Sequence, residues 1–456
     1  MVKAPIIVGG GISGLSAAYY LKQAGVTAVL LERDSRVGGV IRTRTMDGCV
    51  IEGGPDSFLA AKPAAVELIA ELGLAGELIS SNDRQRITYI LRSGRLMPMP
   101  DGLMMMVPSK LRPLLATRLL SWPAKIRMAL EFFRRPPGQP LPDRSVAEFI
   151  ADHYGTEALD YLAEPLLAGV YGGDPAQLSA ASVLTRFVEL ETKYGSLTRA
   201  VLDARRKAAP RHAQIPLFQT LKRGMGALVS AIEERIPPPI HAEAEIVERS
   251  GSGYRVRANG EWMETGQVIL ACPSWRAARL VRTLRPALAQ LLEAIPYSSS
   301  LTLSLGYRKT DFAEPLRGFG FLVPRRERER LVACTWVGTK FAYRVPDDRV
   351  LLRCFFGGES DEAILKETDE AVTAIARHEL AGIMNVRAEP VFAEISRWPR
   401  SMAQYTVGHR ERVKEIEAET ASLPGLHLIG NAYQGIGIPD CIRLAKEAAS
   451  RVAAGE

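Results

Sequence analysis

The first thirty-two residues constrain the fold of this chain more than any other stretch. An apolar run from Ile6 to Val8 leads into the turn Gly9-Gly10-Gly11-Ile12-Ser13-Gly14, a helix-forming segment, and a second apolar run that ends at Glu32. A strand, a tight glycine turn, a helix and a second strand ending in an acid are typical of a dinucleotide-binding domain. The pattern therefore predicts an α/β fold with a Rossmann-like parallel sheet.

Three glycines of this turn have separate expected roles. Gly9 allows the chain to turn sharply, Gly11 lets the backbone approach a pyrophosphate, and Gly14 lets the helix pack against the strand. The first turn of the helix then points its free N–H groups at the phosphates. Glu32, eighteen residues after Gly14, is placed to accept hydrogen bonds from the ribose hydroxyls.

Composition narrows the class of protein. The chain has 456 residues, of which 47% are hydrophobic and 24% charged, as in globular proteins with more than one domain. No apolar run approaches the roughly 20 residues of a membrane-spanning helix, and the first strand begins too early for a signal peptide. Five cysteines without paired spacing indicate reduced thiols and a cytoplasmic protein. Six dispersed histidines predict no metal site.

A second pair of glycines follows the fingerprint closely. Gly38-Gly39 lies a few residues after Glu32, and the strand after the hairpin turn Asp47-Gly48 leads into Glu52-Gly53-Gly54-Pro55-Asp56-Ser57. Two glycine pairs so soon after the first turn indicate a ligand longer than NAD. We therefore expect additional backbone to surround the phosphates and a flavin.

These motifs resemble the FAD-containing amine oxidase and protoporphyrinogen oxidase superfamily, whose members carry an Arg-x-Gly-Gly segment after the fingerprint. Here that segment is Arg36 to Gly39. Many members have an arginine directly after the glycine pair, whereas this chain has Val40, as porphyrinogen oxidases often have an apolar residue there. The segment GPDSF, from Gly54 to Phe58, resembles the bacterial branch of the protoporphyrinogen oxidase family.

The last sixty residues carry the second strong resemblance. Arg397-Trp398-Pro399 and the run from Leu426 to Ile442 are similar to the C-terminal flavin segment of the same family. A buried strand is expected to end at Gly430-Asn431, and a glycine loop is expected to open a terminal helix from Pro439. The N–H groups of that helix are expected to face the pyrimidine end of the flavin, where they would stabilise the negative charge of the reduced form.

The resemblance implies a discontinuous FAD-binding domain of residues 1–83, 215–275 and 396–456. A helical insertion is expected at 84–214 and a mixed-sheet substrate domain at 276–395. The residues expected to bind FAD are Gly9, Gly11, Ile12, Ser13, Gly14, Glu32, Arg33, Gly38, Gly39, Val40, Gly53, Gly54, Pro55, Asp56, Ser57, Ala244 (an adenine-contacting position in the family), Trp398, Gly430, Asn431, Gly437, Ile438 and Pro439.

The segment from Arg84 to Arg135 combines positive charge with apolar side chains. It holds eleven Lys or Arg and only two acids, an excess of nine, against +7 for the whole chain. Such a segment suits an anionic membrane surface, a pocket for a flat ligand bearing carboxylates, or an amphipathic subdomain with a solvated basic face. Nucleic acid is not expected as a partner, because no nucleic-acid motif is present. Six of the twelve methionines lie here: Met97, Met99, Met104, Met105, Met106 and Met128.

The resemblance spans essentially the whole chain and implies that FAD and molecular oxygen oxidise a porphyrinogen to a porphyrin in three two-electron steps that release hydrogen peroxide. No catalytic side chain is expected beyond the flavin, because a dry pocket and an oriented flavin suffice for an activated substrate. The methionine-rich stretch favours protoporphyrinogen IX, and the charge excess favours coproporphyrinogen III. We take protoporphyrinogen IX as the first expectation and coproporphyrinogen III as the alternative. Two further partners are candidates by this resemblance: the anionic inner face of the cell membrane and the next enzyme of the haem pathway.

Five residues are expected to line the tetrapyrrole cavity. Gly169 matches the family position whose backbone carbonyl faces the substrate. Leu322, Val323, Phe355 and Phe356 are candidates for the apolar wall of the substrate domain, although a place in an ordinary core is the simpler explanation for any one of them.

The propionate-binding residue departs from the family pattern. Plant members use an arginine at the position that Met97 occupies here, and Arg95 lies two residues earlier. We expect Arg95, or another base of the segment such as Lys110, to take over that role.

Three rival functions share parts of the pattern. A flavin amine oxidase would add an aromatic cage at the flavin, and a carotenoid desaturase would add a long apolar tunnel. A flavin-free escort protein of prenylated GTPases would share the fold and would lack the yellow colour of a bound flavin.

Overall fold

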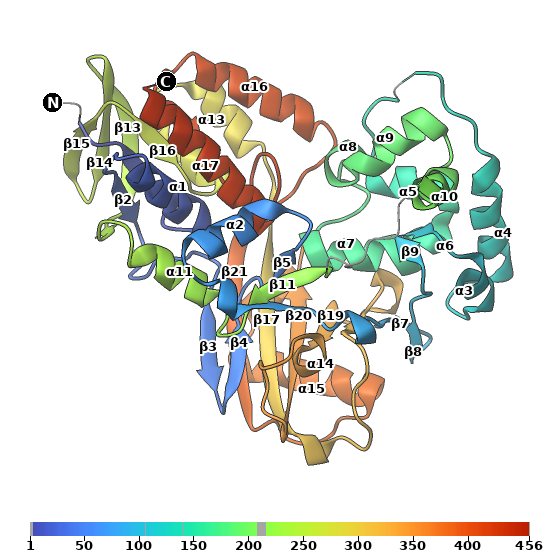
Figure 1. The fold of residues 1–456 in the computed structure, drawn as a ribbon. Helices are drawn as coiled ribbons and strands as arrows, with labels where there is room; N and C mark the ends of the chain where they lie inside the picture. Colours follow the sequence, from blue (N-terminus) through green and yellow to red (C-terminus); the bar gives the residue numbers. More distant parts are fainter. Residues whose placement is uncertain (1–2, 105, 140, 208–215, 456) are drawn as a thin grey trace. The chain divides into compact units, whose positions relative to one another are not determined.

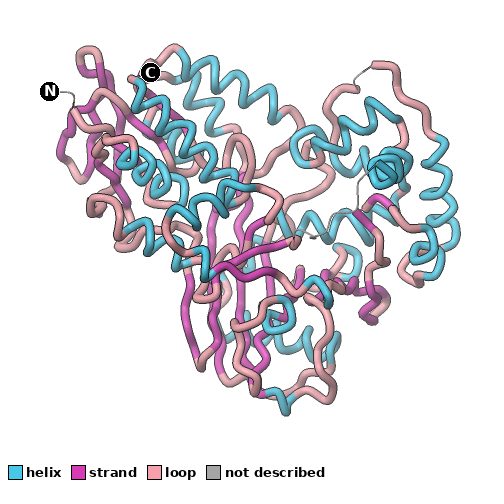
Figure 2. Tube along the Cα trace, viewed as in Figure 1, coloured by secondary structure: helices cyan, strands magenta, loops and turns pink. Residues whose placement is uncertain are grey.

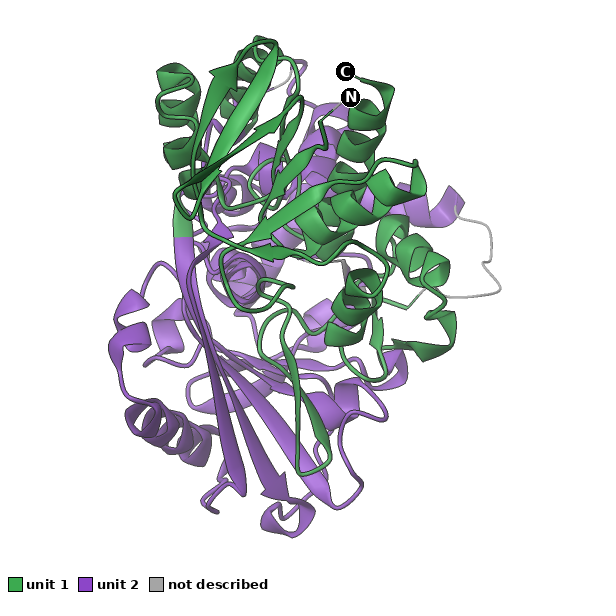
Figure 3. Cartoon of the chain, turned by 90° about the vertical axis from the view of Figure 1, so that its left-hand side faces the viewer, with its two compact units in different colours: residues 1–81, 216–297, 410–456 green, residues 82–215, 298–409 purple. Residues whose placement is uncertain are grey.

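The computed structural model describes residues 3–104, 106–139, 141–207 and 216–455. Met105 and the expected domain boundary at residues 214 and 215 lie outside these ranges. The chain divides into two compact units, each built from discontinuous segments (Figure 3). Unit 1 comprises Met1–Ser81, Pro216–Tyr297 and Arg410–Glu456, and unit 2 comprises Asn82–Ile215 and Ser298–His409.

A five-stranded parallel sheet forms the centre of unit 1. Its strand order is β12-β2-β1-β16-β22, and every neighbouring pair is parallel. The central strands are short, fully apolar runs because helices cover both faces of such a sheet. This architecture confirms the predicted α/β class. The strands are β1 (Ile6–Val8), β2 (Val29–Glu32), β12 (Ile240–His241), β16 (Val268–Leu270) and β22 (Leu426–Leu428).

Helices α1 (Ile12–Gln23) and α17 (Ile438–Ala454) pack side by side in unit 1 (Figure 1). Small residues on α1, including the buried Ala17 and Ala18, allow this close approach. The expected terminal helix is thus confirmed. The other helices of this unit are α2 (Pro63–Glu71), α11 (Gly226–Glu233), α12 (Ser274–Leu280), α13 (Pro286–Glu293) and α16 (His409–Ala421).

Three smaller sheets complete unit 1. The predicted hairpin turn at Asp47-Gly48 joins β3 to β4, and both turn residues have positive φ. Ala244 begins the antiparallel strand pair β13 and β14, which continues into β15. The strands are β3 (Thr43–Met46), β4 (Cys49–Glu52), β5 (Phe58–Leu59), β6 (Leu78–Ser80), β11 (Phe218–Leu221), β13 (Ala244–Ser250), β14 (Gly253–Ala258) and β15 (Glu261–Thr265).

Unit 2 contains a seven-stranded sheet of order β21-β17-β20-β19-β18-β7-β8. β18 and β7 pair in parallel, and the pairs β17–β20, β20–β19, β19–β18 and β7–β8 are antiparallel. Most helices of this unit gather apart from the sheet, whereas helix α15 (Asp369–Met384) lies beside it (Figure 2). The strands are β7 (Thr88–Arg92), β8 (Arg95–Pro98), β17 (Tyr297–Arg308), β18 (Gly320–Leu322), β19 (Ala333–Trp336), β20 (Arg349–Gly357) and β21 (Phe392–Ala403).

The ends of this sheet differ from the expected segment boundaries. The segment predicted as a helical insertion begins with the hairpin β7–β8, because Ser93 and Gly94 both adopt the positive φ that a tight turn requires. At the other end, residues 396–403 belong to β21 and therefore to unit 2. Trp398 thus belongs to the mixed sheet of unit 2 and not to the segment Arg410–Glu456 of unit 1.

Short helices form the other part of unit 2. They include α3 (Leu111–Ala116), α4 (Trp122–Leu130), the 3-10 helix η3 (Glu131–Phe133) and α5 (Val146–Tyr154). A capping box starts α5, since the Glu148 N–H donates to Ser145 Oγ at 3.1 Å and the Ser145 N–H donates to the Glu148 carboxylate at 2.9 Å. The remaining elements are α6 (Thr156–Ala158), the π-helical turn η4 (Leu159–Ala163), α7 (Glu164–Tyr171), α8 (Ala180–Val183), α9 (Thr185–Tyr194) and α10 (Leu197–Lys207).

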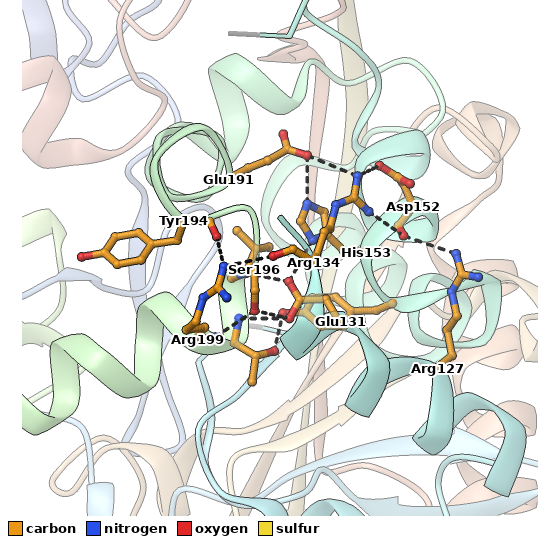
Figure 4. Close-up of polar contacts among 12 residues, drawn as sticks. Arg127, Glu131, Arg134, Asp152, His153, Glu191, Tyr194, Ser196 and Arg199 are labelled. Carbon is orange, nitrogen blue, oxygen red and sulfur yellow. Dashed lines mark hydrogen bonds and ion pairs between the residues drawn. The ribbon is translucent and has the colours of Figure 1, made fainter. Parts of the chain in front are cut away.

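A buried ionic cluster ties these helices together (Figure 4). His153 Nδ1 lies 3.0 Å from Glu131, and its Nε2 lies 3.0 Å from Glu191. Glu131 also accepts the N–H of Leu197 at 2.6 Å, and so satisfies the start of α10. Arg144 approaches Glu191 at 2.6 Å. Hydrogen bonds to the two carboxylates raise the pKa of His153 despite its burial, and the bond to His153 lowers the pKa of both carboxyls against the desolvation that opposes it.

The described residues lack two features, a metal-binding cluster and a membrane-spanning helix. No group of three or more His, Cys, Asp or Glu there is arranged to hold a metal ion. None of the helices in the described ranges has the length and apolar character needed to cross a bilayer.

Candidate flavin and substrate sites

The carboxyl ends of the parallel strands in unit 1 meet at one sheet edge. Gly9 follows β1, Glu32 ends β2, Ala271 follows β16, and Gly430 lies just beyond β22. Ligands of open α/β sheets bind at this edge. The structure therefore brings together two motifs that are about four hundred residues apart in the sequence.

The glycine turn has the geometry expected of a phosphate-binding loop. Gly9 adopts φ +110°, and a Cβ there would lie 2.8 Å from the Ala271 carbonyl oxygen. A Cβ on Gly14 would lie 1.9 Å from the Gly9 carbonyl oxygen, so the helix and strand pack too closely for any side chain. A Cβ on Gly11 meets no atom within 4 Å, and no side chain caps α1 at this residue. Open space in front of uncapped N–H groups fits the pyrophosphate of a dinucleotide.

Glu32 is held by the same turn. Its carboxylate accepts the Gly10 N–H at 2.6 Å and the Asp34 N–H at 2.8 Å. A Cβ on Gly10 would lie 2.9 Å from that carboxylate and 3.0 Å from Val37. No role was expected for Gly10, the middle glycine of three. Its contacts show that it makes room for the side chain that is expected to bind the ribose.

The second glycine loop packs directly on the first. The Gly38 N–H donates to the Gly10 carbonyl at 2.7 Å, and a Cβ on Gly39 would lie 3.3 Å from Gly11. Arg36 holds the loop closed by donating to the carbonyls of Val37 at 3.0 Å and Ile41 at 3.1 Å. Burial lowers the pKa of this guanidinium. The arginine of the Arg-x-Gly-Gly segment is therefore a support of the loop.

Arg33 directly follows Glu32, the last residue of β2. Its side chain is half exposed and forms an ion pair with Asp34 at 3.2 Å. The Val40 side chain is also exposed, and the Val40 carbonyl oxygen would lie only 1.9 Å from a Cβ on Gly54. Gly54 therefore lets the loop after β4 approach the backbone at Val40, before β3.

Glu52, which precedes Gly53-Gly54, was not expected to have a role and is a buried anchor. It accepts the Thr43 hydroxyl at 2.7 Å and the Met225 N–H at 2.7 Å. It thereby satisfies the start of α11, as a carboxylate does at a helix N-terminus. The downstream turn holds Gly53, Pro55, Asp56 and Ser57, and the Ser57 hydroxyl donates to Asp56 at 2.6 Å.

The remaining expected cofactor residues fall at element ends. Ile12 and Ser13 form the buried first turn of α1, and Ala244 is the first residue of β13. Asn431 follows Gly430, Gly437 immediately precedes α17, and Ile438 and Pro439 begin it.

The N-terminus of α17 carries an ion pair. Lys62 Nζ lies 2.6 Å and 2.8 Å from the two carboxylate oxygens of Asp440, and one of these oxygens accepts the Gly437 N–H at 3.3 Å. Burial raises the pKa of Cys441 to about 11 and that of Cys272 to about 12. Both side chains are therefore thiols that pack in the protein, as expected from the sequence.

Three expected substrate residues share one row of the seven-stranded sheet in unit 2. Met97 is opposite Ile90, Ile90 is opposite Leu322, Leu322 is opposite Ala333, and Ala333 is opposite Phe355. Residues in register on neighbouring strands present their side chains to the same face. Met97, Leu322 and Phe355 are the partly exposed members of this apolar strip, whereas Ile90 and Ala333 between them are buried. Met97 and Leu322 also pack against the core of the helical part.

The opposite face of the sheet is ordinary core. Leu303, Phe321, Cys334 and Phe356 belong to a buried cluster that includes residues of helix α15 (Asp369–Met384). Val323 and Phe356, which were also expected in the apolar wall, are instead buried in this cluster, because consecutive residues of extended backbone face opposite sides of a sheet.

Gly169 lies beside this row. It is exposed on α7, and a Cβ there would lie 3.5 Å from Leu322 Cδ2. The helix ends at Gly172, whose left-handed conformation (φ +58°) terminates it. Unit 2 therefore brings Gly169 and Leu322 into contact distance from segments about 150 residues apart.

The two candidate propionate-binding residues differ in availability. Arg95 is exposed on β8 and shares a strand face with Met97, two residues on. Lys110 Nζ lies 2.5 Å from Asp101, so its charge is already paired. The geometry favours Arg95.

The comparison with known proteins establishes the class. Residues 12–453 match the family model described as "Flavin containing amine oxidoreductase". The chain therefore belongs to this family and is a flavin-dependent oxidoreductase, as the glycine motifs predicted.

Two named relatives and one solved structure match nearly the whole chain. The chain is 35% identical to the coproporphyrinogen III oxidase of Bacillus subtilis, with 98% of this chain and 97% of that protein covered. It is 30% identical to the chloroplastic protoporphyrinogen oxidase 1 of Spinacia oleracea, over 98% of this chain and 83% of that one. The crystal structure of a putative protoporphyrinogen oxidase from an Exiguobacterium species superposes with a TM-score of 0.87 at 30% identity, with both chains fully covered.

Proposed function

We propose that this protein oxidises coproporphyrinogen III to coproporphyrin III, with FAD as cofactor and molecular oxygen as electron acceptor. The observation that carries the proposal is full-length similarity to a bacterial coproporphyrinogen III oxidase at 35% identity. This similarity favours the alternative over our first expectation, protoporphyrinogen IX. In the methionine-rich stretch, on which that expectation rested, Met106 and Met128 are buried, and Met97 and Met99 are partly exposed.

The residues of unit 1 fit FAD. Gly11 and the uncapped start of α1 leave room for the pyrophosphate, and Glu32 is oriented by Gly10 to accept the ribose hydroxyls. The start of α17 supplies N–H groups at the same sheet edge, and Lys62 neutralises the carboxylate of Asp440 there. We assign the isoalloxazine pyrimidine to this helix start, where a positive potential favours a reduced flavin.

The bound flavin supplies hydride acceptance and reoxidation by oxygen, and the side chains of the protein orient and enclose the substrate. The strip of Met97, Leu322 and Phe355 provides a flat apolar surface suited to a macrocycle. Gly169 removes a side chain where a flat ligand would approach α7. No acid–base pair is required, because the substrate is already activated and its binding and orientation provide the main contribution to the rate acceleration.

Arg95 is the proposed propionate ligand. It lies on the strand face of Met97 and is exposed. A guanidinium binds a carboxylate through two parallel hydrogen bonds. Its position next to the apolar strip would place a peripheral carboxylate at the edge of the macrocycle.

The cellular setting of the reaction belongs to the same proposal. We infer a cytoplasmic enzyme that contacts the inner face of the cell membrane peripherally and hands its porphyrin to the next haem-pathway enzyme.

The test is the stoichiometry of the reaction that the purified protein catalyses. We expect a yellow flavoprotein that consumes oxygen and releases hydrogen peroxide in proportion to the coproporphyrin formed. Release of an aldehyde and ammonia from an amine, with no reaction on a porphyrinogen, would instead identify a flavin amine oxidase. A colourless protein that gains no activity with added FAD would support the escort-protein alternative.

A further inference from the structure

The hairpin β7–β8 carries two arginines on opposite strands. Arg92 and Arg95 are directly paired in the strand register, so their side chains lie on the same face of the sheet, where two like charges repel each other. Their contacts differ. Arg92 Nη1 lies 2.8 Å from Glu157 and also donates to the Leu119 carbonyl. In the part of the chain that the structure describes, the Arg95 side chain is exposed and forms no hydrogen bond or ion pair. Arg92 is therefore engaged by the protein, and Arg95 is available to a ligand.

The ring of Tyr161 holds Arg92 from the helical part of unit 2. The Arg92 guanidinium carbon lies 4.4 Å from the ring centroid, which is the distance of a cation–π contact. A second guanidinium, that of Arg326, lies 5.4 Å from the same centroid and pairs with Asp160 at 3.1 Å. Tyr161 is buried. The position of its ring is therefore fixed by two cations from different segments.

Glu327 connects Tyr161 to the turn of the hairpin. It ends the 3-10 helix η6 (Arg325–Glu327). The Tyr161 hydroxyl donates to Glu327 Oε1 at 2.9 Å, and the Ser93 N–H donates to Glu327 Oε2 at 2.9 Å. Hydrogen bonds to an ionised acceptor are stronger than those between neutral groups. Ser93 is the first turn residue, two positions before Arg95, so the carboxylate of Glu327 ties the turn to the helical part.

The helical segment that carries Tyr161 also reaches the apolar strip. Tyr161 lies in the π-helical turn η4, which continues directly into α7. α7 carries Gly169, where a Cβ would lie 3.5 Å from Leu322 Cδ2. π-Helical turns occur frequently at functional sites. One continuous helical segment therefore contacts both the strip and the hairpin that carries Arg95.

We propose that Tyr161 and Glu327 are positioning residues for substrate binding, which fix the turn of the hairpin β7–β8 and so hold the Arg95 guanidinium at the place of a substrate carboxylate. The inference rests on the proposed function, because it takes Arg95 as the propionate ligand. Arg95 lies on β8, the edge strand of the sheet. A ligand that binds to a backbone already fixed does not have to order it, and this raises the affinity.

Tyr161→Phe is the first test, because it removes the hydroxyl and keeps the ring on Arg92. We expect KM of the FAD-bound enzyme for coproporphyrinogen III to rise about three- to tenfold and kcat to change by less than about twofold. The flavin absorbance should be that of the wild type. The control Tyr194→Phe removes a hydroxyl that donates to Asp203 at 3.4 Å elsewhere in unit 2, and it should leave KM unchanged.

Variants of Glu327 test the accepting oxygens. Glu327→Ala loses both accepted hydrogen bonds, whereas Glu327→Gln keeps one amide oxygen that can accept. We expect the largest KM in the alanine variant and a partial return towards the wild-type value in the glutamine variant. A role in folding alone would lower Tm in these variants without this order of KM values.

A double-mutant cycle tests whether Tyr161 acts through Arg95. The KM of Y161F/R95A should equal that of R95A within about twofold, because the hydroxyl has nothing left to position. Independent roles would instead multiply the two effects.

Hydrogen exchange measures the hairpin without turnover. We expect the amides of residues 88–98 to exchange faster in E327A than in the wild type, because the turn has lost its tie to the helical part. Y194F should exchange like the wild type in this segment.

Several results would overturn the inference. Unchanged KM in Y161F and E327A, together with a raised KM in R95A, would overturn it and leave the proposed function standing. Multiplied effects in Y161F/R95A, or an unchanged KM in R95A, would do the same. Turnover of neither porphyrinogen by the wild type would overturn the proposed function, and this inference with it.

Discussion

A Cβ on Gly14 would lie 1.9 Å from the carbonyl oxygen of Gly9. The obstacle is backbone, so no side-chain rearrangement can relieve it. Gly11, three residues earlier, is different, because a Cβ there meets nothing within 4 Å. One glycine is therefore required by the fold, and the other is required only by a ligand.

Alanine substitutions should separate these two requirements. Gly14→Ala should destabilise unit 1 by about 1–3 kcal/mol or more, because it forces α1 away from β1. Gly11→Ala should leave the Tm of the apoprotein nearly unchanged and weaken FAD binding by at least about tenfold. Thermal unfolding and flavin titration of the apoprotein measure the two effects. Normal FAD affinity in G11A would contradict the placement of the pyrophosphate.

Phe355 and Phe356 provide a matched pair for the substrate strip. Phe355→Leu should raise KM for the porphyrinogen by on the order of tenfold, since it removes part of the apolar surface in contact with the macrocycle. Phe356→Leu, on the opposite face, should lower stability by about 1 kcal/mol and leave KM unchanged. Steady-state kinetics and urea unfolding distinguish the two. Equal KM values in both variants would mean that the strip is core alone.

Arg95→Ala should raise KM for coproporphyrinogen by about tenfold or more and affect kcat less, because a lost charged hydrogen bond costs about 1.5–3 kcal/mol. The FAD spectrum should not change. Lys110→Ala serves as the control, since Lys110 is already paired with Asp101. An unchanged KM in R95A would exclude Arg95 as the propionate ligand.

The buried cluster predicts a pH dependence of stability. The pKa of His153 is raised above 6.5, so its contribution is fully present below that value and is lost as pH rises through the raised pKa. The pKa values of Glu131 and Glu191 are lowered below 4.5, so their contribution is present above that value and is lost as pH falls through the lowered values. The cluster therefore stabilises unit 2 most between these two limits.

His153→Gln tests this prediction. It leaves two buried carboxylates without a cation between them and should cost about 3–5 kcal/mol near pH 5.5. The difference from wild type should shrink as pH rises through the raised pKa of His153, where the wild-type side chain loses its proton. Urea unfolding over a series of pH values from about 5.5 upward measures the difference, with the exposed His378→Gln as control. A pH-independent difference would show that His153 is not charged in the cluster.

Local motifs explain which parts could be predicted. The spacing of Gly9, Gly11, Gly14 and Glu32 specifies one supersecondary unit, and the structure contains it. The capping box of Ser145 and Glu148 is similarly local.

Other features depend on contacts between distant segments. Arg36 and Glu52 act through backbone groups that fold against them, which a sequence does not display. The row that joins Met97 to Leu322 and Phe355 depends on strand register across five strands. The hairpin at Ser93-Gly94 did have a local signal, the turn itself, which was obscured by the basic and apolar composition of the segment.

The most direct test is a comparison of kcat/KM for coproporphyrinogen III and protoporphyrinogen IX, each prepared anaerobically and followed by porphyrin fluorescence after admission of air to the FAD-loaded enzyme. We predict that coproporphyrinogen III is favoured by about tenfold or more. Preference for protoporphyrinogen IX would restore our first expectation and contradict the substrate assignment. Turnover of neither would contradict the account as a whole.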